Sequence, residues 1–244
     1  MTLPEAIEIM TSEIASVLSD AVSSMYLYGS VAVGDFRFGW SDIDILVLTN
    51  KEMTKQQAER LLLLRHFLTE KYEGCTFFRA FEGAIVAEDV FFLGKTGKVV
   101  YWGTSGQRFA DSYRLSSFSL LELLECGILL RGKDVRGRML RPSYAQLCEE
   151  TRQHMYAARR HGNSVGWVLD LCRGLYTVRT GMVTSKTRAG EWALQEEVCP
   201  DVEVLQRAVM IRKEPLKYAK EDWIVDNAII QRFADVLERN LPNR

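Results

Sequence analysis

Hydrophobic positions alternate between helical and strand spacing over the first third of the chain. Residues 4–21 carry apolar side chains three and four positions apart, with Pro4 in a first turn, which predicts an amphipathic helix. The apolar runs 23–29 and 42–48 are short and are followed by turn residues, so both predict β-strands. Residues 54–72 return to the helical period and predict a second amphipathic helix.

The next region is richer in aromatic and β-branched residues. Residues 75–93 predict one or two strands on that composition. The glycines at the two ends of 94–97 predict the turn of a hairpin that leads into a strand at 98–102. An apolar pattern of helical period follows at about 116–131 and predicts a helix.

Beyond residue 142 the pattern is almost wholly helical, and Ser185 is expected to cap a helix that begins at Lys186. Strands followed by helices predict an α+β fold. We place the boundary at about 138–143, which gives an N-terminal domain at 1–140 with a mixed sheet and helices. Residues 141–244 would then form an all-helical C-terminal domain.

Composition excludes several classes of protein. The 244 residues are 47% hydrophobic and 26% charged, as in a soluble globular protein, and no apolar run approaches the roughly 20 residues of a membrane span. No export signal is visible at the N-terminus, so we expect a cytoplasmic protein without a membrane partner. The net charge of −1 argues against a nucleic-acid partner. Five cysteines without a C-x-x-C pair, and only three histidines, argue against structural zinc.

Two aspartates begin the second predicted strand. Alternation places Asp42 and Asp44 on one face of the strand, while Ile43 and Ile45 point to the core. Neighbouring carboxylates raise each other's pKa unless a cation lies between them. Magnesium ions would supply that charge, and two-metal sites stabilise the attacking and leaving oxygens of phosphoryl transfer. Asp42 and Asp44 are therefore predicted metal ligands and catalytic residues. The alternative is a solvated strand end.

A glycine and a serine end the first predicted strand. Gly29 would allow a sharp turn and close approach of the backbone to a ligand. Ser30 could cap a following helix, and helix N-termini bind phosphate through their backbone N–H groups. A triphosphate is expected between this turn and the metal ions.

Residues 28–47, "YGSVAVGDFRFGWSDIDILV", resemble the signature of the DNA polymerase β-like nucleotidyltransferase superfamily, with Gly-Ser, a spacer, and D-x-D preceded by Ser41. The resemblance implies transfer of a nucleoside monophosphate from a nucleoside triphosphate, and a third carboxylate on a neighbouring strand. "RAFEGAIV" at 79–86 resembles the Arg-x-x-Glu strand of streptomycin/spectinomycin-type aminoglycoside adenylyltransferases. This implies that Glu82 is the catalytic base and a third metal ligand.

A glutamate inside an apolar strand is hard to explain without a function. Glu82 could take the proton of an acceptor hydroxyl or complete a metal shell. Glu88 and Asp89 are the alternatives, but both are expected to be solvated, because the strand ends there.

The resemblance continues in residues 168–194, which are similar to a helix pair of the same adenylyltransferases. It implies that Arg173 and Lys186 contact the nucleotide. An arginine on an apolar helix face needs an anionic partner, which a triphosphate provides; Asp170 or Glu191 could provide it instead. The residues that the resemblance implies for nucleotide binding are Gly29, Ser30, Ser41, Arg173 and Lys186.

The acceptor is less well defined. The resembling enzymes carry an acidic residue that meets the cationic drug, where this chain has Asn163. Trp102 and Trp167 could stack on an acceptor or belong to the core.

The sequence as a whole predicts a magnesium-dependent nucleotidyltransferase, with two ions, that moves AMP from ATP to a hydroxyl of a small molecule, in particular an aminoglycoside antibiotic. One alternative is a protein or RNA acceptor, favoured only by the basic run at 152–162. Another is a catalytically silent nucleotide-binding module, against which the presence of all three carboxylates argues.

Overall fold

The computed structural model describes residues 1–104, 106–219 and 223–242. Contacts group the chain into two compact units. The sheet unit comprises Met1–Ala32, Asp42–Leu115 and Glu122–Leu140, and the helical unit comprises Val33–Ser41, Ser116–Leu121 and Arg141–Arg244. The short segment 33–41, which joins the two halves of the predicted nucleotidyltransferase motif, is therefore part of the helical unit. The division into domains at 1–140 and 141–244 stays a prediction.

The described residues form a six-stranded mixed sheet in the order β5-β4-β3-β2-β1-β6. Its strands are β1 Val22–Tyr28, β2 Ile43–Thr49, β3 Phe81–Ala87, β4 Val99–Gly103, β5 Gly106–Ala110 and β6 Ile128–Gly132. Only β2 and β3 pair in parallel; the other neighbours are antiparallel. A mixed sheet with helices, followed by a helical region, confirms the predicted α+β class. The parallel pair lies at the centre of the sheet, and it carries the predicted carboxylates.

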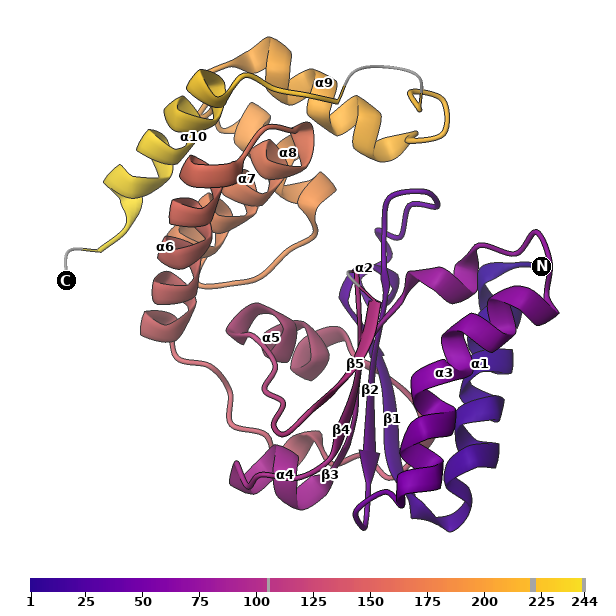
Figure 1. Cartoon of the computed structure of the whole chain (residues 1–244). Helices are drawn as coiled ribbons and strands as arrows, with labels where there is room; N and C mark the ends of the chain where they lie inside the picture. Colours follow the sequence, from indigo (N-terminus) through magenta and orange to yellow (C-terminus); the bar gives the residue numbers. More distant parts are fainter. Residues whose placement is uncertain (105, 220–222, 243–244) are drawn as a thin grey trace. The chain divides into compact units, whose positions relative to one another are not determined.

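Helices α1 (Leu3–Leu18) and α3 (Lys55–Lys71) cover one face of the sheet, at the right in Figure 1. Each helix begins with a capping box. The side chain of the threonine, Thr2 or Thr54, accepts a hydrogen bond from the backbone N–H of the third helical residue, and the side chain of that residue accepts one from the backbone N–H of the threonine. Both helices turn an apolar face to the sheet. The two helices predicted from hydrophobic spacing are thus confirmed.

Residues 75–93, predicted as one or two strands, contain the single strand β3, and the strand predicted at 98–102 is β4. After β3 the chain forms helix α4 (Glu88–Leu93), which ends where Gly94 takes a left-handed conformation (φ 64°). Two acidic residues in the first turn favour this helix, since they complement its dipole. The predicted hairpin turn at 94–97 is therefore wrong: it joins a helix to β4, although β3 and β4 do pair antiparallel.

The helix predicted at 116–131 is shorter than expected. Helix α5 (Ser117–Cys126) ends early, and β6 pairs antiparallel with β1. A short apolar run is ambiguous between helix and strand on its pattern alone. Pairing with β1 satisfies backbone groups at that edge of the sheet, which decides for a strand.

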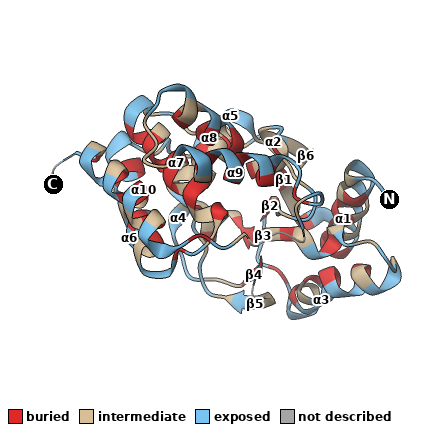
Figure 2. Cartoon of the chain, turned by 90° about the horizontal axis from the view of Figure 1, so that it is seen from above, coloured by how far each residue is buried: buried red, intermediate tan, exposed pale blue. Residues whose placement is uncertain are grey.

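The helical unit is built around α7. Its helices are α6 Tyr144–His161, α7 Val165–Thr180, α8 Lys186–Gln195, α9 Val202–Lys213 and α10 Asn227–Asn240. Helix α7 contacts each of the others and contributes many of the buried residues of their common core. Figure 2 colours buried residues red along the whole described chain. Ser185 accepts a hydrogen bond from the backbone of Arg188, so its predicted cap is confirmed. None of the helices in the described part of the chain is long and apolar enough to cross a membrane.

Candidate active site

A close approach of backbone and carboxylate explains the glycine of the motif. Gly29 follows β1 and begins the short helix α2 (Gly29–Ala32) with φ +62°. A Cβ at this position would lie 2.0 Å from Oδ2 of Asp44. Both the backbone angle and the contact disfavour a side chain here. The carboxylate of Asp44 therefore packs directly on the turn.

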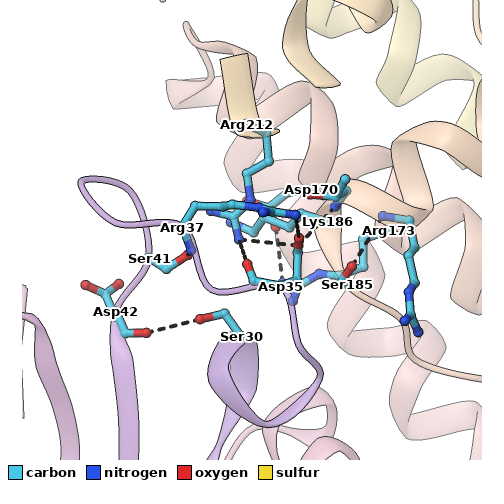
Figure 3. Close-up of polar contacts among 12 residues, drawn as sticks. Ser30, Asp35, Arg37, Ser41, Asp42, Asp170, Arg173, Ser185, Lys186 and Arg212 are labelled. Atoms are coloured by element: carbon cyan, nitrogen blue, oxygen red, sulfur yellow. Dashed lines mark hydrogen bonds and ion pairs between the residues drawn. The ribbon is translucent and has the colours of Figure 1, made fainter. Parts of the chain in front are cut away.

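Ser30 links the two halves of the motif. Its hydroxyl donates a hydrogen bond of 3.1 Å to the backbone carbonyl of Asp42, twelve residues further along the chain (Figure 3). Ser30 lies inside α2, so the prediction that it caps the following helix is wrong. Its hydroxyl fixes the start of β2 relative to the Gly29 turn.

Two of the predicted carboxylates lie side by side on parallel strands. Asp44 of β2 is in register with Glu82 of β3, and both are partly exposed. Ile43 and Ile45 are fully buried, as strand alternation predicts. Asp42 lies just before the first strand residue and is exposed. The expectation of a third carboxylate on a neighbouring strand agrees with this register.

Glu82 has a hydroxyl partner that the sequence reasoning missed. Oγ1 of Thr104, directly after β4, donates a hydrogen bond of 2.5 Å to Oε1 of Glu82. Glu88 and Asp89, the alternatives to Glu82 as the third carboxylate, lie beyond β3, in α4. Glu88 is not simply solvated as expected, because it accepts a hydrogen bond from Ser23 and pairs with an arginine of the sheet unit.

Tyrosines give this end of the sheet a low-dielectric surrounding. Burial raises the pKa of Tyr113 to about 12, and the negative charges of Asp44 and Glu82 add to the shift. Burial likewise raises the pKa of Tyr28 well above its usual value. Both phenols are therefore neutral at physiological pH. Charges interact more strongly in such a surrounding than in water.

The carboxylates do not form a closed metal cage. Among residues 1–104, 106–219 and 223–242, the structure shows no group of three or more His, Cys, Asp or Glu side chains arranged to hold a metal ion. Magnesium is commonly bound by one or two carboxylates together with water and substrate phosphates. The neighbouring Asp44 and Glu82 fit that mode of binding. The metal-ligand roles of Asp42, Asp44 and Glu82 stay predictions.

The helical unit holds the two cations that the sequence assigns to the nucleotide. Asp170 of α7 accepts from Arg173 at 3.1 Å and from Lys186 at 2.9 Å (Figure 3). Burial raises the pKa of Asp170, but the charges of Lys186 and Arg173 outweigh it and lower the pKa overall. Of the two internal partners considered for Arg173, the structure shows Asp170; Glu191 instead pairs with Lys213.

A second carboxylate anchors the loop at 33–41. Asp35 is 4% exposed and pairs with Arg37 at 3.2 Å and with Arg212 at 3.4 Å. It also accepts a hydrogen bond of 3.3 Å from the backbone N–H of Thr187, in the first turn of α8. Ser41 closes the loop, since its hydroxyl accepts from the backbone N–H of Arg37 at 2.9 Å.

The sequence reasoning missed Asp35, since a lone acid in a loop carries no signal. It also missed Arg65, a buried arginine of α3. Its position directly after four leucines was a signal that could have drawn attention to it.

Family models match both halves of the chain. Residues 10–74 match the model described as "Nucleotidyltransferase domain", and residues 140–240 match "Aminoglycoside adenylyltransferase, C-terminal domain". The chain therefore carries a nucleotidyltransferase domain followed by an aminoglycoside adenylyltransferase C-terminal domain. The first range includes Asp42 and Asp44, and the second includes Arg173 and Lys186. Glu82 lies outside both ranges, and its assignment rests on its register with Asp44.

A solved structure shares the fold. The chain resembles the crystal structure of a spectinomycin adenyltransferase from Enterococcus faecialis, determined with ATP and spectinomycin, with a TM-score of 0.65. The match covers 97% of this chain and 100% of that one, at 17% sequence identity. At this identity the likeness establishes the fold.

Two tryptophans of the adenylyltransferase differ in their surroundings. Trp102 is fully buried, and its indole N–H donates to the backbone carbonyl of Leu61 at 3.1 Å, so it belongs to the core of the sheet unit. Trp167 is partly buried and packs against the core of the helical unit, next to His154. Asn163, which replaces an expected acid, is exposed.

Proposed function

We propose that the adenylyltransferase moves AMP from ATP to a hydroxyl group of a small cationic acceptor, an aminoglycoside antibiotic. Glu82 takes the proton of the acceptor hydroxyl, the oxygen attacks the α-phosphorus of ATP, and pyrophosphate leaves. Bound magnesium, in the form of two ions, would neutralise phosphate charge and lower the barrier to displacement. Asp42, Asp44 and Glu82 are the residues that would hold it.

One observation carries this proposal: Asp44 and Glu82 are in register on parallel strands, and the Gly29 turn packs on the Asp44 carboxylate. A base and a metal ligand side by side suit in-line transfer to a hydroxyl. In the helical unit, Arg173 and Lys186 lie close together, since both pair with Asp170. Two neighbouring cations suit a triphosphate.

The alternative acceptors have less support. The basic run at 152–162 was the one feature that favoured RNA, and its Arg159 is engaged with Asp235 and Glu238 at 2.7 Å each. Arg152 donates to a backbone carbonyl near the C-terminus at 2.8 Å. These contacts give the run a structural role. The presence of all three carboxylates argues against a catalytically silent module.

The test is mass spectrometry of reactions that contain the protein, ATP, magnesium and a panel of aminoglycosides that includes spectinomycin and streptomycin. We expect one drug to gain the mass of AMP with the intact protein and not with Asp44→Asn. A panel without any adduct would overturn the aminoglycoside acceptor. Absence of magnesium-dependent ATP binding would overturn nucleotidyl transfer as well.

A further inference from the structure

A buried arginine lies beneath the carboxylates of the sheet unit. Arg65 is on α3 and is 8% exposed, among leucines that face the sheet. Burying a guanidinium costs several kcal/mol before its partners compensate. A leucine or methionine would fill the same space without that cost. The side chain therefore calls for a role other than packing.

The guanidinium contacts three strands, β3, β4 and β5. One terminal nitrogen donates to the carbonyl of Phe81 at 2.7 Å, and the other donates to the carbonyl of Gly103 at 3.2 Å. The second nitrogen also donates to Oε1 of Gln107 at 3.0 Å. The planar fork of arginine suits such fixed, divergent bonds, and a lysine could not reproduce them.

The two carbonyls belong to the residues that directly precede Glu82 and Thr104, which are hydrogen-bonded to each other. Phe81 precedes Glu82 on β3, and Gly103 precedes Thr104 at the end of β4. One side chain thus fixes the backbone on both sides of that bond. Burial lowers the pKa of Arg65, and the nearby charges of Glu82 and Asp42 oppose the shift. The cation is therefore within electrostatic reach of two of the predicted site carboxylates.

We propose that Arg65 is a positioning residue for the catalytic base: it holds the ends of β3 and β4 so that Thr104 binds one oxygen of Glu82 and leaves the other to accept the proton. This inference rests on the proposed function, in which Glu82 is the base. A base that a third group orients is a recurring arrangement in catalysis. A misplacement of about 1 Å can reduce a rate about 100-fold.

The kinetic test compares Arg65→Met, Arg65→Lys and Thr104→Val. We expect kcat to fall about 100-fold in Arg65→Met and about 10-fold in Thr104→Val, while KM for ATP changes less than about 2-fold. Arg65→Lys keeps the charge but loses the fork, so it should restore kcat only in part. The matched control is Arg131→Met, which removes an arginine that pairs with Glu8 at the surface of the same unit.

A double variant separates positioning from simple stabilisation. Since Arg65 acts through Thr104, the combined Arg65→Met/Thr104→Val variant should have nearly the kcat of Arg65→Met alone. Multiplied effects, or a lower melting temperature with unchanged kcat, would overturn the inference. If Arg65→Met does not fold, Thr104→Val decides, because Thr104 is exposed: an unchanged kcat in that variant overturns the proposal.

Failure of the proposed function would be recognised separately. If the intact protein transfers AMP to no acceptor, hydrogen–deuterium exchange of the peptides 81–87 and 99–104 decides whether Arg65 holds the strand ends. Faster exchange in Arg65→Met than in Arg131→Met would support the positioning role. Equal exchange in the two variants would overturn it.

Discussion

The sheet unit and the helical unit gather charge of opposite sign. In the sheet unit, Asp42, Asp44 and Glu82 lie at the motif end of β2 and β3, and the donors of Arg65 beneath them are directed to backbone carbonyls and an amide. In the helical unit, two carboxylates are each held by two cations. Asp35 is paired with Arg37 and Arg212, and Asp170 with Arg173 and Lys186.

This difference indicates the charge of the ligand that each region would bind. Neighbouring carboxylates favour a bound cation, because like charges repel. Neighbouring cations favour a bound anion. Magnesium for one unit and the phosphates of ATP for the other would satisfy both. The following variants test that assignment.

The largest expected effect is the loss of transfer in Asp44→Asn. Removing this carboxylate removes a predicted metal ligand next to the base, and we expect kcat to fall at least about 1,000-fold. The measurement is AMP transfer at saturating ATP and magnesium. Asp20→Asn, which breaks an exposed pair with Lys51, is the control. Activity of Asp44→Asn above about a tenth of the parent would contradict a metal role.

The second variant tests the packing of the turn. Gly29→Ala would place a Cβ 2.0 Å from the Asp44 carboxylate, so we expect kcat to fall about 100-fold. Gly34→Ala is a matched control: its φ is +71°, but nothing lies within 4 Å of the added atom. Both variants should lose about 1 kcal/mol of stability from the strained backbone. Equal activity of the two variants would show that the contact with Asp44 has no catalytic importance.

The third variant tests the cationic region. Lys186→Gln should raise KM for ATP about 10-fold, because it removes a charge-assisted contact to phosphate. Arg188→Gln changes an exposed cation two residues further along the same helix and serves as control. Isothermal titration with ATP and magnesium gives the same comparison without turnover. An unchanged affinity in Lys186→Gln would leave Asp170 as the functional partner of this lysine.

The smallest expected effect is on stability and depends on pH. Burial raises the pKa of Asp35, but hydrogen bonds from Thr187 and the charge of Arg212 outweigh it, so the folded pKa lies below the usual 3.8. The charged form therefore stabilises the fold above pH 3.8, and this contribution is lost as the pH falls through the lowered value.

Asp35→Asn should accordingly reduce the free energy of unfolding by about 1 kcal/mol at pH 6, and the difference from the parent should shrink below pH 4. Chemical denaturation at several pH values measures it. A difference that stays constant from pH 6 to pH 3 would show that the charge of Asp35 does not stabilise the fold.

Local signals predicted much of the fold. Helical spacing predicted α1 and α3, because each helix satisfies its own backbone and buries one stripe of side chains. The same reasoning failed at 94–97 and at β6. In both places a short apolar or glycine-containing segment fits more than one structure, and pairing within the sheet decides between them.

The residues of the candidate site also divide into those that the sequence predicted and those that it did not. The Gly-Ser turn and the two aspartates are close in sequence, so a short motif predicted them together. The sequence also placed Glu82 on a neighbouring strand through its resemblance to a known family. Thr104, however, reaches Glu82 from directly after β4, and Arg65 reaches the preceding Phe81 carbonyl from α3. The sequence does not indicate these partners, because they lie far apart in the chain.

The sequence by itself determined several of the helices and strands, the residue types of a phosphoryl-transfer site and the spacing of the motif. These depend on interactions between residues near one another in the chain. Only the tertiary structure decided that Asp44 is in register with Glu82, that Asp170 pairs with Arg173 and Lys186, and that Arg65 bonds to the backbone beside Glu82. Those pairings depend on strand register and helix packing, which bring together residues far apart in the chain.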